Sequence, residues 1–234
     1  MEKIIIITGG ASGLGLEMAK YFLYRDHNVC VIDGAQDKVD KLQSLKEEYS
    51  NLKILTYCAN VANEASIEKI INEIASDYEI EYLFNNAGII RAGHFSKNSK
   101  EVVDSVFESI IVGSLIVTSK VLPHMKKINS GKIINIMSSA ALLGKANESV
   151  YCAAKFALKG FTLALKEELK PTNIRVVGVF PGGINTPFYE NIREYTPKYV
   201  SDKYMNAKKV ARVICENSLQ IETLSVSDIS IERV

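Results

Sequence analysis

Four tyrosines in this sequence are followed by a lysine four positions later, a spacing that can support acid–base chemistry. On a helix, residues four apart lie on one face, so the lysine ammonium would sit beneath the phenol. A free tyrosine has a pKa near ~10, and a neighbouring positive charge favours the phenolate and lowers that value. Such a tyrosine can give a proton to a substrate oxygen or take one from it. The four pairs are Tyr49/Lys53, Tyr151/Lys155, Tyr199/Lys203 and Tyr204/Lys208.

The surrounding sequence selects Tyr151 and Lys155 among these pairs. Tyr151 stands at the start of a long helical stretch, 149–170, and a buried apolar run, 132–137, comes before it and leads into Ser138. Ligands of parallel sheets sit beyond the carboxyl ends of the strands, where such connecting loops gather. The other three pairs are expected to be solvated helix or loop residues.

A glycine cluster near the start of the chain could bind a phosphate. Four isoleucines, residues 4–7, run into Thr8 and a loop that contains four glycines. A β-branched run of this kind predicts a strand buried on both faces, and the stretch after the loop has helical spacing. Glycine allows a tight turn and close backbone approach, and a helix N-terminus attracts anions, although a glycine cluster alone also occurs in structural turns. The expected contacts to a pyrophosphate come from Gly9, Ser12, Gly13, Leu14 and Gly15.

The second expected strand, 28–33, ends in a carboxylate about twenty residues after the glycine loop. In this position Asp33 can accept hydrogen bonds from an adenosine ribose, although an aspartate at a strand end is also common on protein surfaces. The same carboxylate would repel the 2′-phosphate of NADP. No arginine or lysine stands at positions 11, 12, 34 or 35 to offset it. The sequence therefore favours NAD over NADP.

Short apolar runs alternate with helical stretches along the whole chain. This alternation predicts an α/β fold: a doubly wound parallel sheet of about seven strands with helices on both faces. No linker interrupts the pattern, so we expect one domain over 1–234. Ser201 and Asp202 are the expected start signal of the last helix. The expected strands are 4–8, 28–33, 53–58, 81–84, 132–137, 174–180 and 224–231, and the expected helices are 14–26, 37–49, 64–77, 99–127, 149–170 and 206–219.

Composition narrows the classes of function. The formal net charge is +1, which predicts neither a nucleic-acid partner nor a basic membrane surface. The isoleucine run is far shorter than the ~20 apolar residues of a membrane span. Four cysteines lie far apart and three histidines are scattered, so we expect no metal site and no disulfide framework. The sequence predicts a reduced, cytoplasmic protein.

Three motifs together resemble the short-chain dehydrogenase/reductase family. They are Thr-Gly-x-x-x-Gly-x-Gly at 8–15, Asn-Asn-Ala-Gly at 85–88 and Tyr-x-x-x-Lys at 151–155, in the family's order and spacing. Each motif is weak alone, and the combination is specific over nearly the whole chain. The resemblance implies a Rossmann-type sheet, a nicotinamide cofactor, and hydride transfer to or from a carbonyl or alcohol.

The resemblance also implies roles for individual residues. Tyr151 would be the general acid or base, and Lys155 would lower its pKa and hold the nicotinamide ribose. Ser138, with Ser139 as the less favoured candidate, would donate a hydrogen bond to the substrate oxygen. Further cofactor contacts would come from Asn86, Ala87 and Gly88 after the fourth strand, and from Pro181, Gly182, Ile184 and Thr186 after the sixth.

Two positions depart from the family pattern. An Asp-Val pair is expected after the third strand, and Asn60-Val61 stands there, with an amide oxygen that can still accept from adenine. An asparagine is expected in the long helix three residues before Gly113, and Ile110 stands in its place. Isoleucine keeps the backbone carbonyl but loses the side-chain amide, and Ser109 or Ser114 could take over part of its role in proton transfer.

The leading interpretation is an oxidoreductase that transfers a hydride between NAD(H) and a small secondary alcohol or ketone. The alternatives are an NADPH-dependent reductase similar to 3-oxoacyl carrier-protein reductases, and a non-catalytic dinucleotide-binding regulator. We expect the segment 187–205 to form a lid over the substrate. The resemblance suggests a homodimer formed by the helices 99–127 and 149–170, and a possible tetramer through the last strand.

Overall fold

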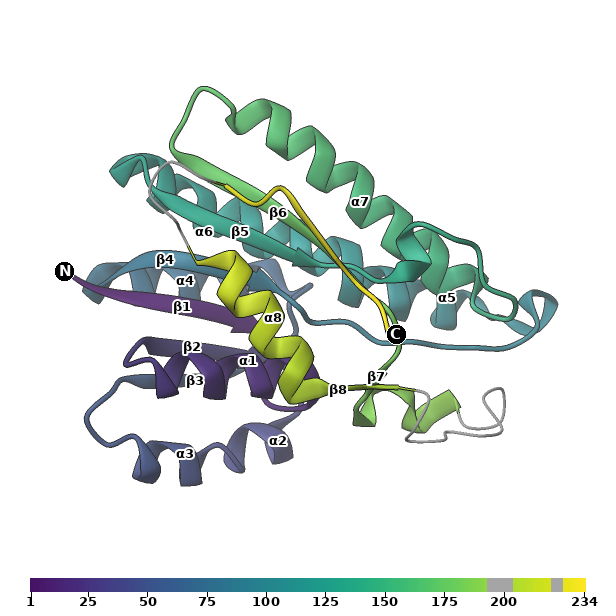
Figure 1. Cartoon of the computed structure of the whole chain (residues 1–234), viewed down its shortest axis with the longest axis horizontal. Coiled ribbons are helices and arrows are strands. Elements are labelled where there is room, and N and C mark those ends of the chain that lie inside the picture. Colours follow the sequence, from purple (N-terminus) through teal and green to yellow (C-terminus); the bar gives the residue numbers. More distant parts are fainter. Residues whose placement is uncertain (193–203, 220–224) are drawn as a thin grey trace.

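A seven-stranded parallel sheet forms the centre of the protein (Figure 1). The computed structural model describes residues 1–192, 204–219 and 225–234. Within these residues the strand order is β3-β2-β1-β4-β5-β6-β9, and every pairing in this sheet is parallel. The fold is therefore the predicted single, doubly wound domain. The strands are β1 (Glu2–Thr8), β2 (Asn28–Asp33), β3 (Ile54–Cys58), β4 (Tyr78–Asn85), β5 (Gly131–Ile136), β6 (Ile174–Pro181) and β9 (Asp228–Ile231).

The central strand β1 shows why its sequence is apolar without alternation. Ile5 and Ile7 point into the hydrophobic core on one face of the sheet, and Ile4 and Ile6 point into the core on the other. All four side chains are fully buried, as expected for a parallel strand covered on both sides.

Helices cover both faces of the sheet. In Figure 1, α1 (Gly13–Tyr24) and α8 (Ala207–Ser218) lie on the near face, and α4 (Glu64–Asp77) and α6 (Gly113–Ile128) lie behind the sheet. The second half of α7 (Ser149–Leu169) contributes Leu165 and Leu169 to the same core as α4 and α6.

Three expected helices differ from the structure in detail. The stretch 37–49 forms two short helices, α2 (Gln36–Asp40) and α3 (Gln43–Glu48). The stretch 99–127 is α5 (Lys100–Phe107) and α6, joined by one π-helical turn, Glu108–Val112. The last helix begins at Ala207, where the Asn206 side chain accepts a hydrogen bond from the Lys209 N–H at 3.0 Å. The expected start signal at 201–202 lies outside the described residues.

The sheet order creates one switch point. From β1 the chain proceeds outward to β2 and β3, and from β4 it proceeds in the opposite direction to β5 and β6. The loops after β1 and β4 therefore diverge and leave a crevice at the carboxyl ends of these strands, where ligands of doubly wound sheets bind.

The helical segment Lys100–Ile128 is unusually apolar. It contains 29 residues, and its most apolar window has a mean hydropathy of 1.7, enough by length and composition alone to cross a membrane. A core helix of a soluble protein passes the same test. In the fold its inner face buries Val117, Val121 and Met125 against the sheet, while Leu115 on the outer face is 39% exposed.

Candidate active site

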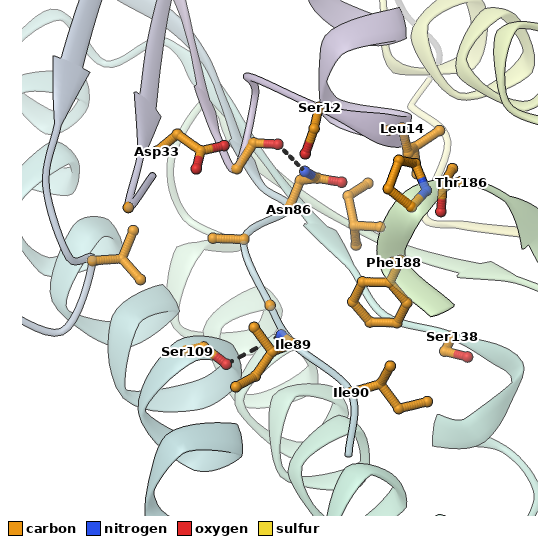
Figure 2. A pocket seen from close by; sticks show the side chains of 18 of the residues that line it. Ser12, Leu14, Asp33, Asn86, Ile89, Ile90, Ser109, Ser138, Thr186 and Phe188 are labelled. Atoms are coloured by element: carbon orange, nitrogen blue, oxygen red, sulfur yellow. Dashed lines mark hydrogen bonds between the residues drawn. The ribbon is translucent and has the colours of Figure 1, made fainter. Parts of the chain in front are cut away.

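A cavity of about 510 Å³ opens at the switch point, within the usual size range of small-molecule sites (Figure 2). Its glycine half is bounded by the loop after β1 and by Asp33. Its tyrosine half is bounded by Ser138, Tyr151 and Phe188. Figure 2 shows Asp33 and Ser12 at one end, Phe188, Ser138 and Ile90 at the other, and Asn86 between them. The predicted residues that line the cavity are Gly9, Ser12, Gly13, Leu14, Asp33, Asn60, Val61, Asn86, Ala87, Gly88, Ser138, Tyr151, Lys155, Pro181, Gly182, Ile184 and Thr186.

Backbone geometry forms the glycine half. Gly9 and Gly13 have φ values of +62° and +53°, which favour glycine, and a Cβ on Gly9 would lie 2.9 Å from the Ala87 Cα. Ser12 stands at the N-cap of α1 without a side-chain hydrogen bond to the helix. The first N–H groups of α1 have no partner within a helix, so they can bind an anion. This loop fits a dinucleotide pyrophosphate.

Gly15 is the one predicted site residue that does not line the cavity. It is buried beneath the glycine loop, where a Cβ would lie 2.2 Å from the Gly9 carbonyl oxygen. It therefore supports the loop by letting α1 approach it, and it does not face a ligand.

Asp33 is held in a fixed position at the far end of the glycine half. It is 9% exposed, and its two carboxylate oxygens accept hydrogen bonds from the N–H groups of Ala11, at 3.1 Å, and Ala35, at 3.2 Å. Each oxygen keeps a free lone pair for a ribose hydroxyl. Lys38 of α2 lines the same end, although no basic residue stands directly after the strand at positions 34 and 35. Lys38 is the third residue of α2, which places it at the cavity.

Asn60 and Asn86 fix the walls of the cavity. The Asn60 Oδ1 accepts a hydrogen bond from the Ala62 N–H at 2.9 Å, so one of its lone pairs is already used. The Asn86 side chain donates to the carbonyl oxygens of Thr8, at 3.0 Å, and Gly9, at 3.1 Å. The Thr8 hydroxyl in turn accepts from the backbone N–H groups of Asn86 and Ala87. These bonds tie the loops after β1 and β4 together.

The tyrosine half contains the predicted Tyr–Lys pair on one face of α7. Tyr151 is 5% exposed and Lys155 is 4% exposed. The Lys155 Nζ donates to the Ile136 carbonyl oxygen at 2.8 Å and lies 5.7 Å from the centroid of the Tyr151 ring. The Ser138 Oγ accepts from the Ala140 N–H at 3.1 Å, which orients the serine beside Tyr151.

Burial dominates the protonation of this pair. It raises the pKa of Tyr151 well above its ordinary value, Tyr189 and Glu148 raise it further, and a hydrogen bond with Ser138 opposes them. Burial also lowers the pKa of Lys155 to about 7. The expectation that Lys155 lowers the pKa of Tyr151 is not met here, because desolvation disfavours both charged forms. At neutral pH Tyr151 is a phenol that can donate a proton.

Ile110 occupies the π-helical turn and is fully buried. Its carbonyl oxygen accepts a hydrogen bond from the Ser114 hydroxyl at 2.6 Å, and its side chain packs beside Gly88. The Ser109 hydroxyl accepts from the Ile89 N–H at 3.3 Å and lines the cavity, whereas Ser114 does not (Figure 2). Of these two serines, only Ser109 lines the cavity.

The expected lid lies partly on the cavity. Its beginning forms a 3₁₀ helix, Pro187–Ile192, and the Phe188 ring lies 6.0 Å from the Tyr151 ring. Residues 184–185 pair with 205–206 in a small two-stranded sheet, which brings the two ends of the segment together. The central part of the expected lid, 193–203, lies outside the described residues.

Several lining residues were not among the predicted catalytic and cofactor contacts. Most follow directly after a predicted motif, so extending each motif by a few positions would have found them. Within the described ranges, no group of three or more His, Cys, Asp or Glu side chains is placed to hold a metal ion. The additional residues are Ile32, Gly34, Ala35, Lys38, Ala59, Ile89, Ile90, Arg91, Ser109, Ile136, Met137, Pro187, Phe188 and Tyr189.

A doubly wound sheet with a glycine loop at its switch point and a buried Tyr–Lys pair beside it defines a dinucleotide-binding oxidoreductase fold. The family model for short chain dehydrogenases matches residues 3–197. The chain therefore belongs to the short-chain dehydrogenase family, as the three motifs predicted. It follows that the cofactor is a nicotinamide dinucleotide and that the reaction interconverts an alcohol and a carbonyl group.

Individual relatives act on different substrates. The chain is 34% identical to the 3-oxoacyl-(acyl-carrier-protein) reductase of Thermotoga maritima, with 82% of this chain and 78% of the relative covered. It is 30% identical to a 3alpha-hydroxysteroid dehydrogenase of Mediterraneibacter gnavus, with 77% and 73% covered. The closed form of serine dehydrogenase complexed with NADP+ superimposes with a TM-score of 0.88 at 26% identity, with 97% and 94% covered.

Proposed function

We propose that the protein transfers a hydride between NAD(H) and a small secondary alcohol or ketone, with Tyr151 as the general acid or base. The observation that carries this proposal is the convergence of Ser138, Tyr151 and Lys155 on the same cavity as the glycine loop. A module that only binds a dinucleotide has no physical reason to keep that trio, so we do not favour the regulator.

The geometry supports a simple division of work in the reducing direction. When bound, the nicotinamide would supply the hydride. The Ser138 hydroxyl donates a hydrogen bond to the carbonyl oxygen and stabilises the negative charge that develops there. Tyr151, a phenol at neutral pH, donates its proton to the same oxygen. Lys155, anchored by the Ile136 carbonyl, holds the nicotinamide ribose and, when charged, stabilises the tyrosinate that remains.

Asp33 supports a preference for NAD(H). Its carboxylate is oriented by two backbone N–H groups, and its free lone pairs match the two hydroxyls of an adenosine ribose. A 2′-phosphate would be repelled there, but Lys38 lies at the same end and would offset part of the repulsion. We therefore propose that NAD(H) is preferred and that NADP(H) is accepted with lower efficiency.

The second candidate is a reductase of 3-oxoacyl groups on a carrier protein. The relative from Thermotoga maritima favours it. Asp33 argues against it, because such reductases usually prefer NADPH. A carrier-linked substrate that is reduced much faster than any free ketone would establish this alternative.

We also propose that the protein is a dimer formed by α6 and α7. Both helices present large apolar side chains to solvent, with Leu115 39% exposed on α6, and Phe156 and Leu163 45% and 50% exposed on α7. Exposed apolar surface of this kind is typical of a subunit interface. Light scattering during size-exclusion chromatography should give twice the chain mass, and Leu163→Glu should shift it toward the monomer.

The deciding experiment measures turnover of a panel of ketones and secondary alcohols with NAD(H) and NADP(H) in parallel. The proposal expects oxidation or reduction of at least one compound, with the higher kcat/KM for NAD(H). The Tyr151→Phe variant should bind NADH with nearly unchanged affinity but lose turnover. Equal turnover by this variant would rule out the proposed mechanism.

A further inference from the structure

Arg91 is a positively charged side chain in the tyrosine half that the proposed mechanism does not use. It stands three residues after Gly88, in the loop between β4 and α5, and it lines the cavity together with Ser138 and Tyr151. We propose that Arg91 binds an anionic group of the substrate, a carboxylate or a phosphate, while the carbonyl lies at Ser138 and Tyr151. This inference rests on the proposed function and names its substrate class.

The chemistry of the lining supports an anion at this position. Asp33, in the glycine half, is the only acidic residue among the described residues that line the cavity. The neighbours of Arg91 in the chain, Ile89 and Ile90, also line the cavity and are apolar. A charge pair in a cavity that is partly shielded from water is stronger than one in bulk water, so a guanidinium in this lining can select for anionic ligands.

The guanidinium of Arg91 has hydrogen-bonding capacity to spare. It is partly buried, and its Nη1 donates to the Ile90 carbonyl oxygen at 3.1 Å. In the described part of the chain it forms no ion pair with a carboxylate. A guanidinium has five N–H donors, so four remain for a ligand. Two of these can bind a carboxylate or phosphate in a bidentate arrangement.

The backbone around Arg91 is fixed relative to the catalytic residues. Ile90 is 2% exposed and packs in the same apolar cluster as Tyr151 and Ile110. The Ile89 N–H donates to Ser109, and the Gly93 N–H donates to the Asn147 carbonyl oxygen at 2.8 Å. The loop is thus tied on one side to the π-helical turn and on the other to the segment that leads into α7. A site held this way can position an anionic group at a defined distance from the carbonyl.

Glu148 is an acidic residue near Tyr151 that is not part of the cavity lining. It lies three residues before Tyr151 and affects the pKa of that tyrosine. Burial raises the pKa of Glu148 itself, and Lys145 opposes that rise.

The test compares charged and neutral ligands of the same skeleton on the NAD⁺-loaded enzyme, in which a ketone has no hydride to accept. The pairs are 4-oxopentanoate with its methyl ester, and dihydroxyacetone phosphate with dihydroxyacetone. Binding is measured by titration calorimetry on the wild type, on Arg91→Met, which keeps an unbranched stem, and on Arg91→Lys, which keeps the charge. Lys97→Met is the control, because Lys97 is an exposed cation in the same loop that does not line the cavity.

The inference expects at least one anion to bind the wild type about tenfold or more tightly than its neutral partner. Arg91→Met should reduce this preference to about twofold or less, Arg91→Lys should keep part of it, and Lys97→Met should keep all of it. The ligand pair that shows the larger preference, 4-oxopentanoate or dihydroxyacetone phosphate, indicates whether the site prefers a carboxylate or a phosphate. Equal binding of the anion and its neutral partner in both arms, or a preference that survives in Arg91→Met, would overturn the inference.

Turnover of the same compounds separates this inference from the proposed function. If anions bind through Arg91 but no compound is reduced or oxidised, the anion site stands and the proposed reaction fails. If ester and acid are reduced equally well and Arg91→Met changes neither, the proposed reaction stands and the anion site fails.

Discussion

The two halves of the cavity are built in different ways. In the glycine half, the ligand-facing groups are mainly backbone: left-handed glycines, helix N–H groups, and a carboxylate held by two further N–H groups. In the tyrosine half they are side chains from three separate parts of the chain: the loop after β4, the β5–α7 region and the 3₁₀ helix after β6. The first half can recognise a part common to many ligands, and the second can vary without changing the fold.

We expect the glycine half to bind the dinucleotide and the tyrosine half to carry out the reaction. The variant that tests this division with the largest effect is Tyr151→Phe. Removing one hydroxyl from the tyrosine half should lower kcat by about 10² to 10⁴, the usual contribution of a general acid or base, while the Kd for NADH changes little. Stopped-flow kinetics and fluorescence titration measure the two quantities.

The matched control is Tyr49→Phe. Tyr49 has a lysine four positions later but ends α3 outside the cavity, so kcat should not change. If both variants lose activity, the loss comes from altered folding and the assignment to Tyr151 fails.

Gly15→Ala changes the glycine half and should affect binding of the dinucleotide, whereas Tyr151→Phe affects turnover. A methyl group on Gly15 would lie 2.2 Å from the Gly9 carbonyl oxygen, so Gly15→Ala must displace the loop that faces the dinucleotide. Overpacking of this kind costs about 1–3 kcal/mol, which corresponds to a loss of roughly 5- to 150-fold in dinucleotide affinity if the whole cost falls on binding. Calorimetric titration with NADH measures the effect. Gly144→Ala is the control, because a Cβ there meets nothing within 4 Å.

The same contrast explains what the sequence could predict. The glycine half was predictable because a strand, a turn and a helix are adjacent in the chain, and only glycine satisfies the backbone there. The doubly wound parallel sheet followed from the alternation of strands and helices, whereas the order of its strands comes from the structure. Phe188 and Tyr189 lie in the segment predicted as a lid, but the sequence did not indicate which side chains of the loops, Arg91 among them, face the cavity, because loop geometry decides this. The protonation of Tyr151 and Lys155 was also not predictable, because it depends on how deeply both are buried.

Two buried lysines allow a pH test of the tyrosine half. The pKa of Lys155 is about 7 in the folded protein, against an ordinary value of 10.5. Between these values the unfolded chain binds a proton that the folded chain does not, so the free energy of unfolding rises with pH by up to about 1.4 kcal/mol per unit. Lys155→Met removes this contribution, so the unfolding free energy of the variant should rise less between pH 7.5 and 9.5. Urea denaturation at several pH values measures it.

Lys132 is the matched comparison for this test. It is 3% exposed, it donates to the Ser218 carbonyl oxygen at 2.7 Å, and burial, with a contribution from Arg175, lowers its pKa. Lys132→Met should therefore also flatten the pH dependence of stability, but it should keep turnover because Lys132 does not line the cavity. A loss of turnover in both variants would show that the effect is structural.

The smallest expected effect is at the Asp33 end of the glycine half, where the Lys38 side chain is expected to influence the choice between NADH and NADPH. Lys38→Ala should lower kcat/KM for NADPH about two- to fivefold and leave the value for NADH nearly unchanged, because a partly exposed charge pair contributes under about 1 kcal/mol. The difference should shrink in 0.5 M salt as the pair is screened. An equal loss for both cofactors would place Lys38 in the support of the adenosine site. The glycine half would then hold the dinucleotide through a side chain as well as through its backbone, and the difference between the two halves would be smaller.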